Sequence, residues 1–199
     1  MRVLVVGSGG REHALCWKLR QSQLRTELYC ALGNPGIAEV ADLVPIAPDE
    51  IQKLADFAQE MNIDLTVVGP ELPLTLGLAD ELDERGIAVF GPRQGAAELE
   101  GSKVFAKEFM ARHGIPTAAF EVVHDANEAR EALRRFGFPV VLKADGLAAG
   151  KGVLIVGDQD EAEDALKMLF EDRRFGRAAD RVVVEECLEG EELSFIALS

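Results

Sequence analysis

Short apolar runs alternate with longer amphipathic stretches over the first 100 residues. Short apolar runs that end at a glycine or a turn predict strands, whereas apolar positions spaced three and four apart predict helices. Because strands that are linked through helices run parallel, we expect an α/β domain at 1–100 with an open parallel sheet and helices on both faces. The predicted strands are 2–6, 28–31, 43–46, 65–68 and 87–90; the predicted helices are one after Gly10 that carries Ala14, Leu15, Trp17, Leu19 and Leu24, and two at about 49–61 and 74–85.

The pattern changes after Gly101. Ser102 is suited to cap a helix that extends to about His113, so we expect a connecting segment at 101–119. From about residue 120 the strands and helices predict a small α+β unit at 120–190. The last stretch, 191–199, reads as the start of another strand that lacks its neighbours, which predicts the first part of a longer protein. The predicted elements of this half are strands at 121–123, 140–142, 153–156 and 181–185 and helices that end near 136 and span about 160–171.

Composition narrows the class of protein. With 48% hydrophobic and 28% charged residues, the chain is typical of a soluble globular protein. Its net charge of -14 argues against a general nucleic-acid or anionic-membrane binder, because phosphate backbones require clustered Lys and Arg. No run is long enough for a signal peptide or a membrane span. The cysteines Cys16, Cys30 and Cys187 show no paired or metal spacing, which favours reduced core thiols and a cytoplasmic location.

The stretch 143–153 carries the clearest candidate chemistry. Gly146, Gly150 and Gly152 lie between two predicted strands, and Lys143 and Lys151 add positive charge at both edges. Exposed backbone amides together with lysines are suited to a polyphosphate, although a hairpin with two solvated lysines is the plainer alternative. The stretch is no P-loop, because only three residues separate Gly146 from Gly150 and a glycine follows Lys151. We therefore expect a nucleotide under a β-hairpin.

Three further glycine-rich loops follow predicted parallel strands. Gly7-Ser-Gly-Gly-Arg-Glu-His13 connects the first strand to the first helix, where free amides and the helix dipole attract a phosphate; a simple tight turn is the alternative. Glu12 stands where a dinucleotide fingerprint would place its third glycine, which argues against a nicotinamide oxidoreductase. The loops Gly33-Asn-Pro-Gly36 and Gly69-Pro-Glu71 follow other strands, so all three loops should converge at one edge of the sheet. Alternatives remain for two residues. Arg11 either pairs with phosphate or is solvated, and His13 either binds a ligand or is a capping or core histidine.

An acidic stretch, 185–192, follows the last predicted strand of the second half. A solvated acidic turn is the simpler interpretation. The functional alternative is that the backbone near Leu188 binds an adenine edge, that a carboxylate binds ribose hydroxyls, and that Cys187 lines the pocket.

Taken together, these motifs strongly resemble the phosphoribosylamine–glycine ligases, also called glycinamide ribonucleotide synthetases, of the ATP-grasp superfamily. The resemblance extends from Val3 to Ser199. It implies a Rossmann-like, pre-ATP-grasp domain at 1–100 and a small ATP-grasp lid at 120–190, with the remainder of the ATP-grasp fold absent. The motifs are Gly7-Ser-Gly-Gly-Arg-Glu-His13, Gly33-Asn-Pro-Gly36, Val67-Val-Gly-Pro-Glu71, Glu100-Gly-Ser-Lys103, the stretch 143–153 and the stretch 185–192.

The resemblance also implies an activity and a set of binding residues. The family joins glycine to 5-phosphoribosylamine with ATP, through an acyl phosphate, and forms glycinamide ribonucleotide, ADP and phosphate in purine biosynthesis. No catalytic side chain is assigned from the sequence. The implied ATP-binding residues are Lys103, Lys143, Gly146, Gly150, Lys151, Gly152, Glu185, Glu186, Leu188 and Glu192, and the implied residues around phosphoribosylamine are Gly9, Gly10, Arg11, Asn34, Gly36, Gly69 and Glu71.

One part of the family's site is not represented. The resemblance places the magnesium ligands and much of the glycine site in the later half of the ATP-grasp fold, so no metal ligand is assigned here and these 199 residues alone are expected to be inactive. A non-catalytic nucleotide-binding or assembly module is the first alternative, and another ATP-grasp carboxylate–amine ligase is the second. The oligomeric state is left open by the sequence.

Overall fold

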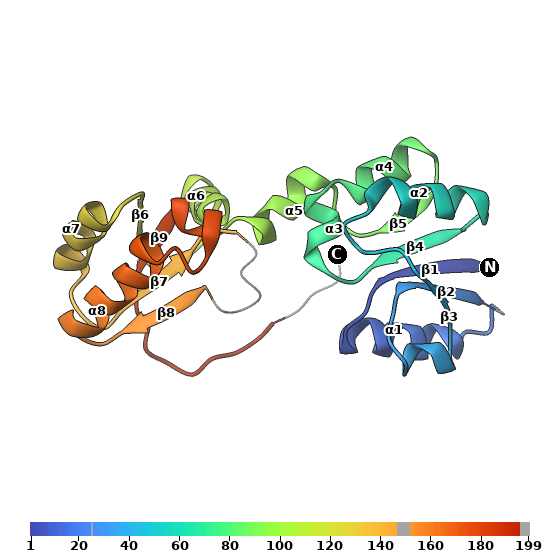
Figure 1. The fold of residues 1–199 in the computed structure, drawn as a ribbon, viewed down its shortest axis with the longest axis horizontal. Coiled ribbons are helices and arrows are strands. Elements are labelled where there is room, and N and C mark those ends of the chain that lie inside the picture. The colour runs from blue at the N-terminus through green and yellow to red at the C-terminus, as the bar shows by residue number, and fades with distance from the viewer. Residues whose placement is uncertain (25, 147–151, 196–199) are drawn as a thin grey trace. The chain divides into compact units, whose positions relative to one another are not determined.

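The fold is described from a computed structural model of the chain, which covers residues 1–24, 26–146 and 152–195. It consists of two compact units, Met1–Gly101 and Ser102–Ser199, each with its own sheet (Figure 1). None of the helices in the described ranges combines the length and the apolar character that are needed to cross a membrane.

The first unit contains a five-stranded sheet in the order β3-β2-β1-β4-β5, in which every neighbouring pair is parallel (Figure 1). The central strand β1 pairs with β2 through Val3 and Leu28 and with β4 through Val3 and Leu65. The open parallel sheet is therefore confirmed. The strands are β1 (Arg2–Gly7), β2 (Glu27–Leu32), β3 (Asp42–Val44), β4 (Leu65–Val68) and β5 (Ala88–Phe90).

Both faces of this sheet are covered by helices. Successive side chains of β1 point to opposite faces, so β1 contributes to the core on each side. One face packs Val5 against Cys16 of α1 and Ile37 of η1. The other packs Val6 against residues of α2 and α4 that include Leu54. The helices of this unit are α1 (Gly10–Arg20), η1 (Ile37–Glu39), α2 (Ile51–Glu60), α3 (Glu71–Thr75), α4 (Leu78–Glu84) and α5 (Gln94–Gly101).

The structure corrects three expectations about these helices. The helix predicted at 74–85 is divided into α3 and α4, because Gly77 has φ +89°, a left-handed conformation that interrupts helical bonding. Helix α5 has no counterpart among the predicted helices. In α1 the apolar positions do not mark the buried face: Trp17 and Leu15 are exposed, whereas Glu12 and Cys16 are buried.

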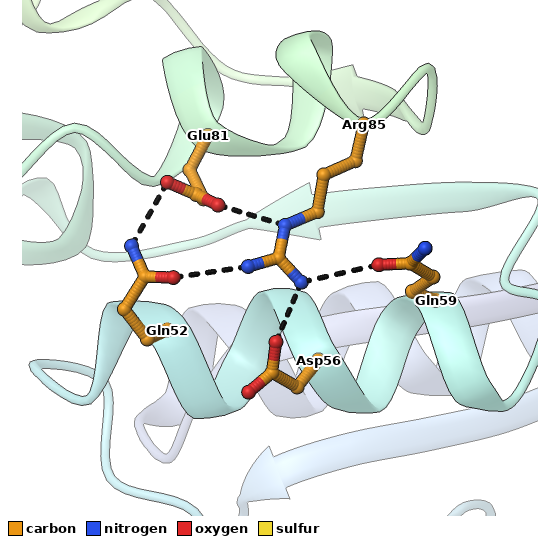
Figure 2. Close-up of polar contacts among 5 residues, drawn as sticks. All are labelled: Gln52, Asp56, Gln59, Glu81 and Arg85. Atoms are coloured by element: carbon orange, nitrogen blue, oxygen red, sulfur yellow. Dashed lines mark hydrogen bonds and ion pairs between the residues drawn. The ribbon is translucent and has the colours of Figure 1, made fainter.

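A polar network joins α2 to α4 on the outside of the first unit (Figure 2). The guanidinium group of Arg85 donates to Glu81 at 2.7 Å and reaches Asp56 at 2.6 Å. It also donates to the side chains of Gln52 and Gln59, and Gln52 in turn donates to Glu81. One arginine at the end of α4 therefore links four polar side chains and fixes the pairing of the two helices.

The second unit is a four-stranded antiparallel sheet in the order β6-β9-β7-β8. Side chains of α7 and α8, among them Leu133 and Leu166, pack on one face and form its core with Leu142 and Val184. Helix α6 contacts β9. The elements are α6 (Lys103–His113), β6 (Phe120–Val123), α7 (Ala126–Phe136), β7 (Val140–Ala144), β8 (Val153–Val156), α8 (Gln159–Leu166), η2 (Lys167–Glu171), η3 (Gly176–Asp180) and β9 (Val182–Glu186).

The predicted final strand is not formed where the structure describes it. Residues 191–195 belong to no strand, and Leu193 and Phe195 are 84% and 88% exposed. An apolar run forms a strand only when a neighbouring strand accepts its backbone hydrogen bonds, and none of the described strands does so here. The remainder of that prediction, 196–199, lies outside the described residues.

Candidate nucleotide and phosphate sites

The three glycine-rich loops of the first unit meet at the carboxyl edge of its sheet, as predicted. They follow the neighbouring strands β2, β1 and β4. The Asn34 side chain joins two of them, because its Nδ2 donates to the carbonyl oxygen of Ser8 at 2.9 Å. Its Oδ1 accepts hydrogen bonds from the backbone N–H groups of Gly36 and Ile37. Asn34 therefore holds its own turn against the first loop.

Glu12 packs between the first and the third loop. Its carboxylate is buried, and Oε2 accepts a hydrogen bond of 2.6 Å from the backbone N–H of Gly9. A Cβ at Gly69 would lie 2.1 Å from Oε1 of Glu12, and a Cβ at Gly7 would lie 2.6 Å from Cγ. The residue that breaks the dinucleotide fingerprint thus fills the space between the loops. It also explains why glycine is required at Gly7 and Gly69.

The remaining predicted residues of this edge differ in exposure. Arg11 forms an ion pair of 3.2 Å with Glu71, and their side chains are 70% and 35% exposed. A Cβ at Gly10 would meet no other described atom within 4 Å, so Gly10 borders open space at the start of α1. His13 lies under the second loop, because a Cβ at Gly36 would be 2.6 Å from its Cε1. The arrangement favours packing for His13, and it leaves amides and an arginine available to an anion.

In the second unit, the amino end of α6 is bonded to the end of β7. Ser102 caps α6 as predicted, since its Oγ accepts from the N–H of Phe105 at 3.0 Å. The same hydroxyl donates to Asp145 at 2.9 Å, and Asp145 is buried and also pairs with Arg181 at 2.5 Å. Next to this cap, Lys103 Nζ donates to the carbonyl oxygen of Gly146 at 2.8 Å. The Lys103 side chain therefore contacts the first glycine of the stretch 143–153.

Lys143 and Glu185 also come together. Their strands β7 and β9 are neighbours, and Lys143 Nζ forms an ion pair with Oε1 of Glu185. The other carboxylate oxygen lies 2.5 Å from Nζ of Lys107, a buried lysine of α6. Glu185 itself is 5% exposed. The predicted ATP-binding residues Lys143 and Glu185 therefore share a cluster with Lys107, a lysine that was not among the predicted site residues.

The other predicted nucleotide-binding residues are more dispersed. Glu186 extends the sheet, because its N–H donates to the carbonyl oxygen of Ala119 at 2.9 Å. Leu188 is 68% exposed and Glu192 is exposed. Gly152 is buried, and its carbonyl oxygen accepts from the N–H of Ala144 at 2.8 Å, which closes the base of the hairpin. Gly150 and Lys151 lie outside the described residues.

Sequence reasoning missed Asp145 and Lys107. Asp145 lies in the stretch 143–153, and its acidic side chain two residues after Lys143 was a usable signal. Lys107 lies four residues after Lys103, which places both on one side of α6. Neither sequence signal identifies the residue that Asp145 or Lys107 contacts. Asp145, for example, is hydrogen-bonded to Ser102, which lies 43 residues earlier in the sequence.

The cysteines agree only in part with the prediction of core thiols. Cys16 and Cys30 are buried and unoxidised, and Cys30 Sγ donates to the carbonyl oxygen of Gly7 at 3.4 Å. The hydrogen bond with the Cys16 thiol, together with burial, raises the pKa of Cys30. Cys187 is half-buried and therefore is not a core residue. No group of three or more His, Cys, Asp or Glu side chains suited to a metal ion occurs in the part of the chain that the structure describes.

The two units define a class of protein. A parallel sheet with glycine-rich loops at its carboxyl edge, followed by an antiparallel sheet with a lysine-bearing hairpin, is the amino-terminal part of an ATP-grasp ligase. Comparison with protein families makes the assignment specific. Residues 1–100 match "Phosphoribosylglycinamide synthetase, N domain", and residues 101–199 match "Phosphoribosylglycinamide synthetase, ATP-grasp (A) domain". The chain belongs to the phosphoribosylglycinamide synthetase family.

Individual relatives agree with this family. The chain is 56% identical over 198 residues to a phosphoribosylamine–glycine ligase of Brucella melitensis and 54% identical over 200 residues to one of Allochromatium vinosum. These matches cover 100% of the chain but 46% and 47% of the relatives, so the chain spans about half their length.

Solved structures give the same result. The crystal structure of a phosphoribosylamine–glycine ligase from Thermotoga maritima matches with a TM-score of 0.74 and 35% identity, over 96% of this chain and 45% of that one. An N5-carboxyaminoimidazole ribonucleotide synthetase from the same organism matches with a TM-score of 0.69 and 22% identity, over 94% of this chain and 46% of that one. At that identity the second likeness concerns the fold alone.

Proposed function

We propose that the protein to which these residues belong is an ATP-dependent ligase that joins glycine to 5-phosphoribosylamine and forms glycinamide ribonucleotide, ADP and phosphate. The observation that carries this proposal is the match of both family domains over residues 1–199, together with relatives at 54–56% identity that bear the ligase name. Each unit has a location suited to one of the two phosphorylated substrates.

The proposed reaction has two steps. A carboxylate is a poor electrophile, so an oxygen of the glycine carboxylate first attacks the γ-phosphorus of ATP, and ADP leaves. The amine of phosphoribosylamine then attacks the carbonyl carbon of the glycyl phosphate, the bond to phosphate breaks, and the amine loses a proton. In such phosphoryl transfers the protein contributes mainly position and charge neutralisation.

The second unit is proposed to hold ATP, with residues 120–190 as its lid. Lys103 lies against Gly146, and Lys143 lies against Glu185. Both ammonium groups are suited to phosphate oxygens, and the backbone from Glu186 to Leu188 would bind the adenine edge, with Glu192 at the ribose. Gly152 closes the base of the hairpin, and Gly150 and Lys151, which lie outside the described residues, stay predicted ATP-binding residues.

The first unit is proposed to bind phosphoribosylamine. Its carboxyl edge brings Asn34 to the loop of Gly9 and Gly10, and Arg11 to Glu71. The amides at the start of α1 and the Arg11 guanidinium would bind the phosphate group, while Gly36 and Gly69 keep the loops close together. ATP-grasp chemistry also implies magnesium. The described residues supply no acidic cluster for that ion, so no step is assigned to it here.

The test is a substrate-omission assay on the intact protein. ADP release should require ATP, glycine and 5-phosphoribosylamine together, and ribosylamine without its phosphate should react far more slowly. ATP binding without turnover under all conditions would instead favour a non-catalytic nucleotide-binding module. Equal turnover with unrelated amines would favour another carboxylate–amine ligase.

A further inference from the structure

Glu185 lies between two lysines in the interior of the second unit. Its Oε2 is 2.5 Å from Nζ of Lys107, and its Oε1 is paired with Nζ of Lys143. The carboxylate is 5% exposed, so water contributes little to its solvation. Two positive charges thus share one negative charge, and either lysine alone would suffice to neutralise Glu185.

The two lysines are held very differently. Lys107 is anchored on a second side, because its ammonium group donates to Oγ1 of Thr117 at 2.7 Å and to the carbonyl oxygen of Ala118 at 3.3 Å. These two hydrogen bonds and the ion pair with Glu185 hold the ammonium group from two sides. The Lys107 side chain is 10% exposed, whereas that of Lys143 is 27% exposed. Lys107 is therefore fixed in place, and Lys143 is the lysine that a ligand can reach.

A phosphate group that binds Lys143 draws the ammonium group away from Glu185. If Lys143 were the sole partner of Glu185, this exchange would leave a buried carboxylate unpaired, which is strongly unfavourable. Because Lys107 stays on Oε2, Glu185 remains neutralised after Lys143 has moved. Freeing Lys143 therefore gives up its contact with Glu185 but leaves no buried carboxylate unpaired.

From this geometry we propose that Lys107 is a positioning residue for nucleotide binding. It keeps Glu185 neutralised so that Lys143 can exchange the carboxylate for a phosphate oxygen of a nucleoside triphosphate. The proposal rests on the proposed function, which supplies the ligand. It differs from a merely structural role in one testable respect. The effect of replacing Lys107 on ligand affinity must depend on the phosphates of the ligand and on the charge of Glu185.

The experiment compares ATP with adenosine. Dissociation constants are measured by calorimetry or competition on the intact protein, its Lys107→Met, Glu185→Gln and double variants, and Lys167→Met as an exposed lysine control. Lys107→Met should weaken ATP binding by about tenfold, the size of one charge-assisted contact, and should change adenosine binding by less than about twofold. In the Glu185→Gln background the same substitution should have little effect, because no buried carboxylate is left to neutralise.

Several outcomes would overturn the proposal. Equal losses for ATP and adenosine would show that Lys107 only supports the fold of the site. An equal loss of ATP affinity in both backgrounds would show that Lys107 attracts phosphate directly. An unchanged ATP affinity in Lys107→Met would remove Lys107 from nucleotide binding.

A second variant covers the case in which Lys107→Met does not fold. Thr117→Val removes one anchor of the ammonium group but keeps the charge, and it should weaken ATP by about twofold to threefold with adenosine unchanged. Equal or absent effects on the two ligands would count against the proposal here too. A parent protein that binds neither ligand overturns the proposed function as well, whereas a parent that binds ATP while the variants lack the expected pattern overturns this inference alone.

Discussion

The hydroxyl group of Ser102 donates a hydrogen bond of 2.9 Å to the buried carboxylate of Asp145, 43 residues further along the chain. The same hydroxyl caps α6 by accepting from the N–H of Phe105. One small side chain thus fixes the start of a helix to the end of β7, directly before the glycine-rich loop.

Replacing Ser102 by Ala should destabilise the second unit more than an ordinary loss of a helix cap. The cap alone is worth about 1 kcal/mol, and the bond to the buried Asp145 adds to it, so we expect a loss of about 2–3 kcal/mol. Chemical denaturation with a probe in the second unit measures this loss. Asp125→Ala, which removes the exposed cap of α7, is the matched control and should cost about 1 kcal/mol. Equal losses in the two variants would contradict a role for Asp145.

Replacing Lys143 by Ala in the intact enzyme should raise the ATP requirement or lower turnover by at least about tenfold. Losing one charged phosphate contact costs about 1.5–3 kcal/mol. The fold should persist, because Glu185 keeps its 2.5 Å pair with Lys107. Steady-state kinetics with varied ATP are the measurement, and the exposed Lys167→Ala is the control. Unchanged kinetics would remove Lys143 from the site.

Two glycine substitutions should separate binding from folding at the edge of the parallel sheet. Gly10→Ala should fold normally, because the added Cβ meets no described atom within 4 Å. If a phosphate lies against the Gly10 amide, the added methyl group should take up part of its space and weaken phosphoribosylamine binding by roughly tenfold. Gly69→Ala should instead lower stability, since its Cβ would lie 2.1 Å from Glu12 Oε1. Melting curves and the Michaelis constant for the amine distinguish the two. A destabilised Gly10→Ala protein would contradict the described geometry.

The network around Arg85 should make stability depend on pH. Hydrogen bonds from Gln52 and then Arg85 lower the pKa of Glu81 from its ordinary value of 4.5. A carboxyl group with a lowered pKa in the folded state stabilises the protein above the ordinary value and loses this contribution as the pH falls through the folded-state value. The difference in melting temperature between the parent and Glu81→Gln should therefore be present at pH 6 and shrink below pH 4.5.

Glu84→Gln supplies the comparison for this measurement, because Glu84 is an exposed carboxylate on the same helix that makes no ion pair with the residues described here. It should show little difference from the parent at either pH. A difference for Glu81→Gln that stays constant from pH 6 to pH 3 would mean that the network is not ionic.

The 199 residues by themselves should not catalyse the ligation. We expect the magnesium ligands and much of the glycine site to lie outside the motifs found here, and the chain spans 46% of the Brucella melitensis relative. The measurement is ADP release by the purified chain in the presence of ATP, glycine and phosphoribosylamine. Release that depends on all three substrates would contradict this prediction.

Much of the fold could be predicted because the relevant signals are local. Strands of three to six residues and amphipathic helices leave periodic patterns, and strand–helix alternation then determines a parallel sheet. Where a conformation depends on one backbone angle or on tertiary packing, the pattern failed. Gly77 interrupts a helix that its neighbours favour, and Trp17 lies on the exposed face of α1 although its side chain is large and mainly apolar.

The candidate sites also contain features that could be predicted from the sequence and features that could not. The meeting of the three glycine-rich loops follows from strand order, so Asn34 and Glu71 could be placed at one edge before the structure was known. The polar clusters could not, because the partners of Asp145 and Lys107 come from distant parts of the sequence and no periodicity links them. Only the folded arrangement shows which lysine is buried and which is reachable.

Both lysines proposed for the triphosphate already have acceptors from the chain itself: Lys103 has the carbonyl oxygen of Gly146, and Lys143 has Glu185. An anion that binds either lysine must replace that acceptor, so it gains only the difference between the two contacts. A single orthophosphate ion, which replaces one acceptor, gains little. A triphosphate that contacts both lysines and the loop amides adds several such differences. The site should therefore discriminate against free phosphate, which is a product of the proposed reaction.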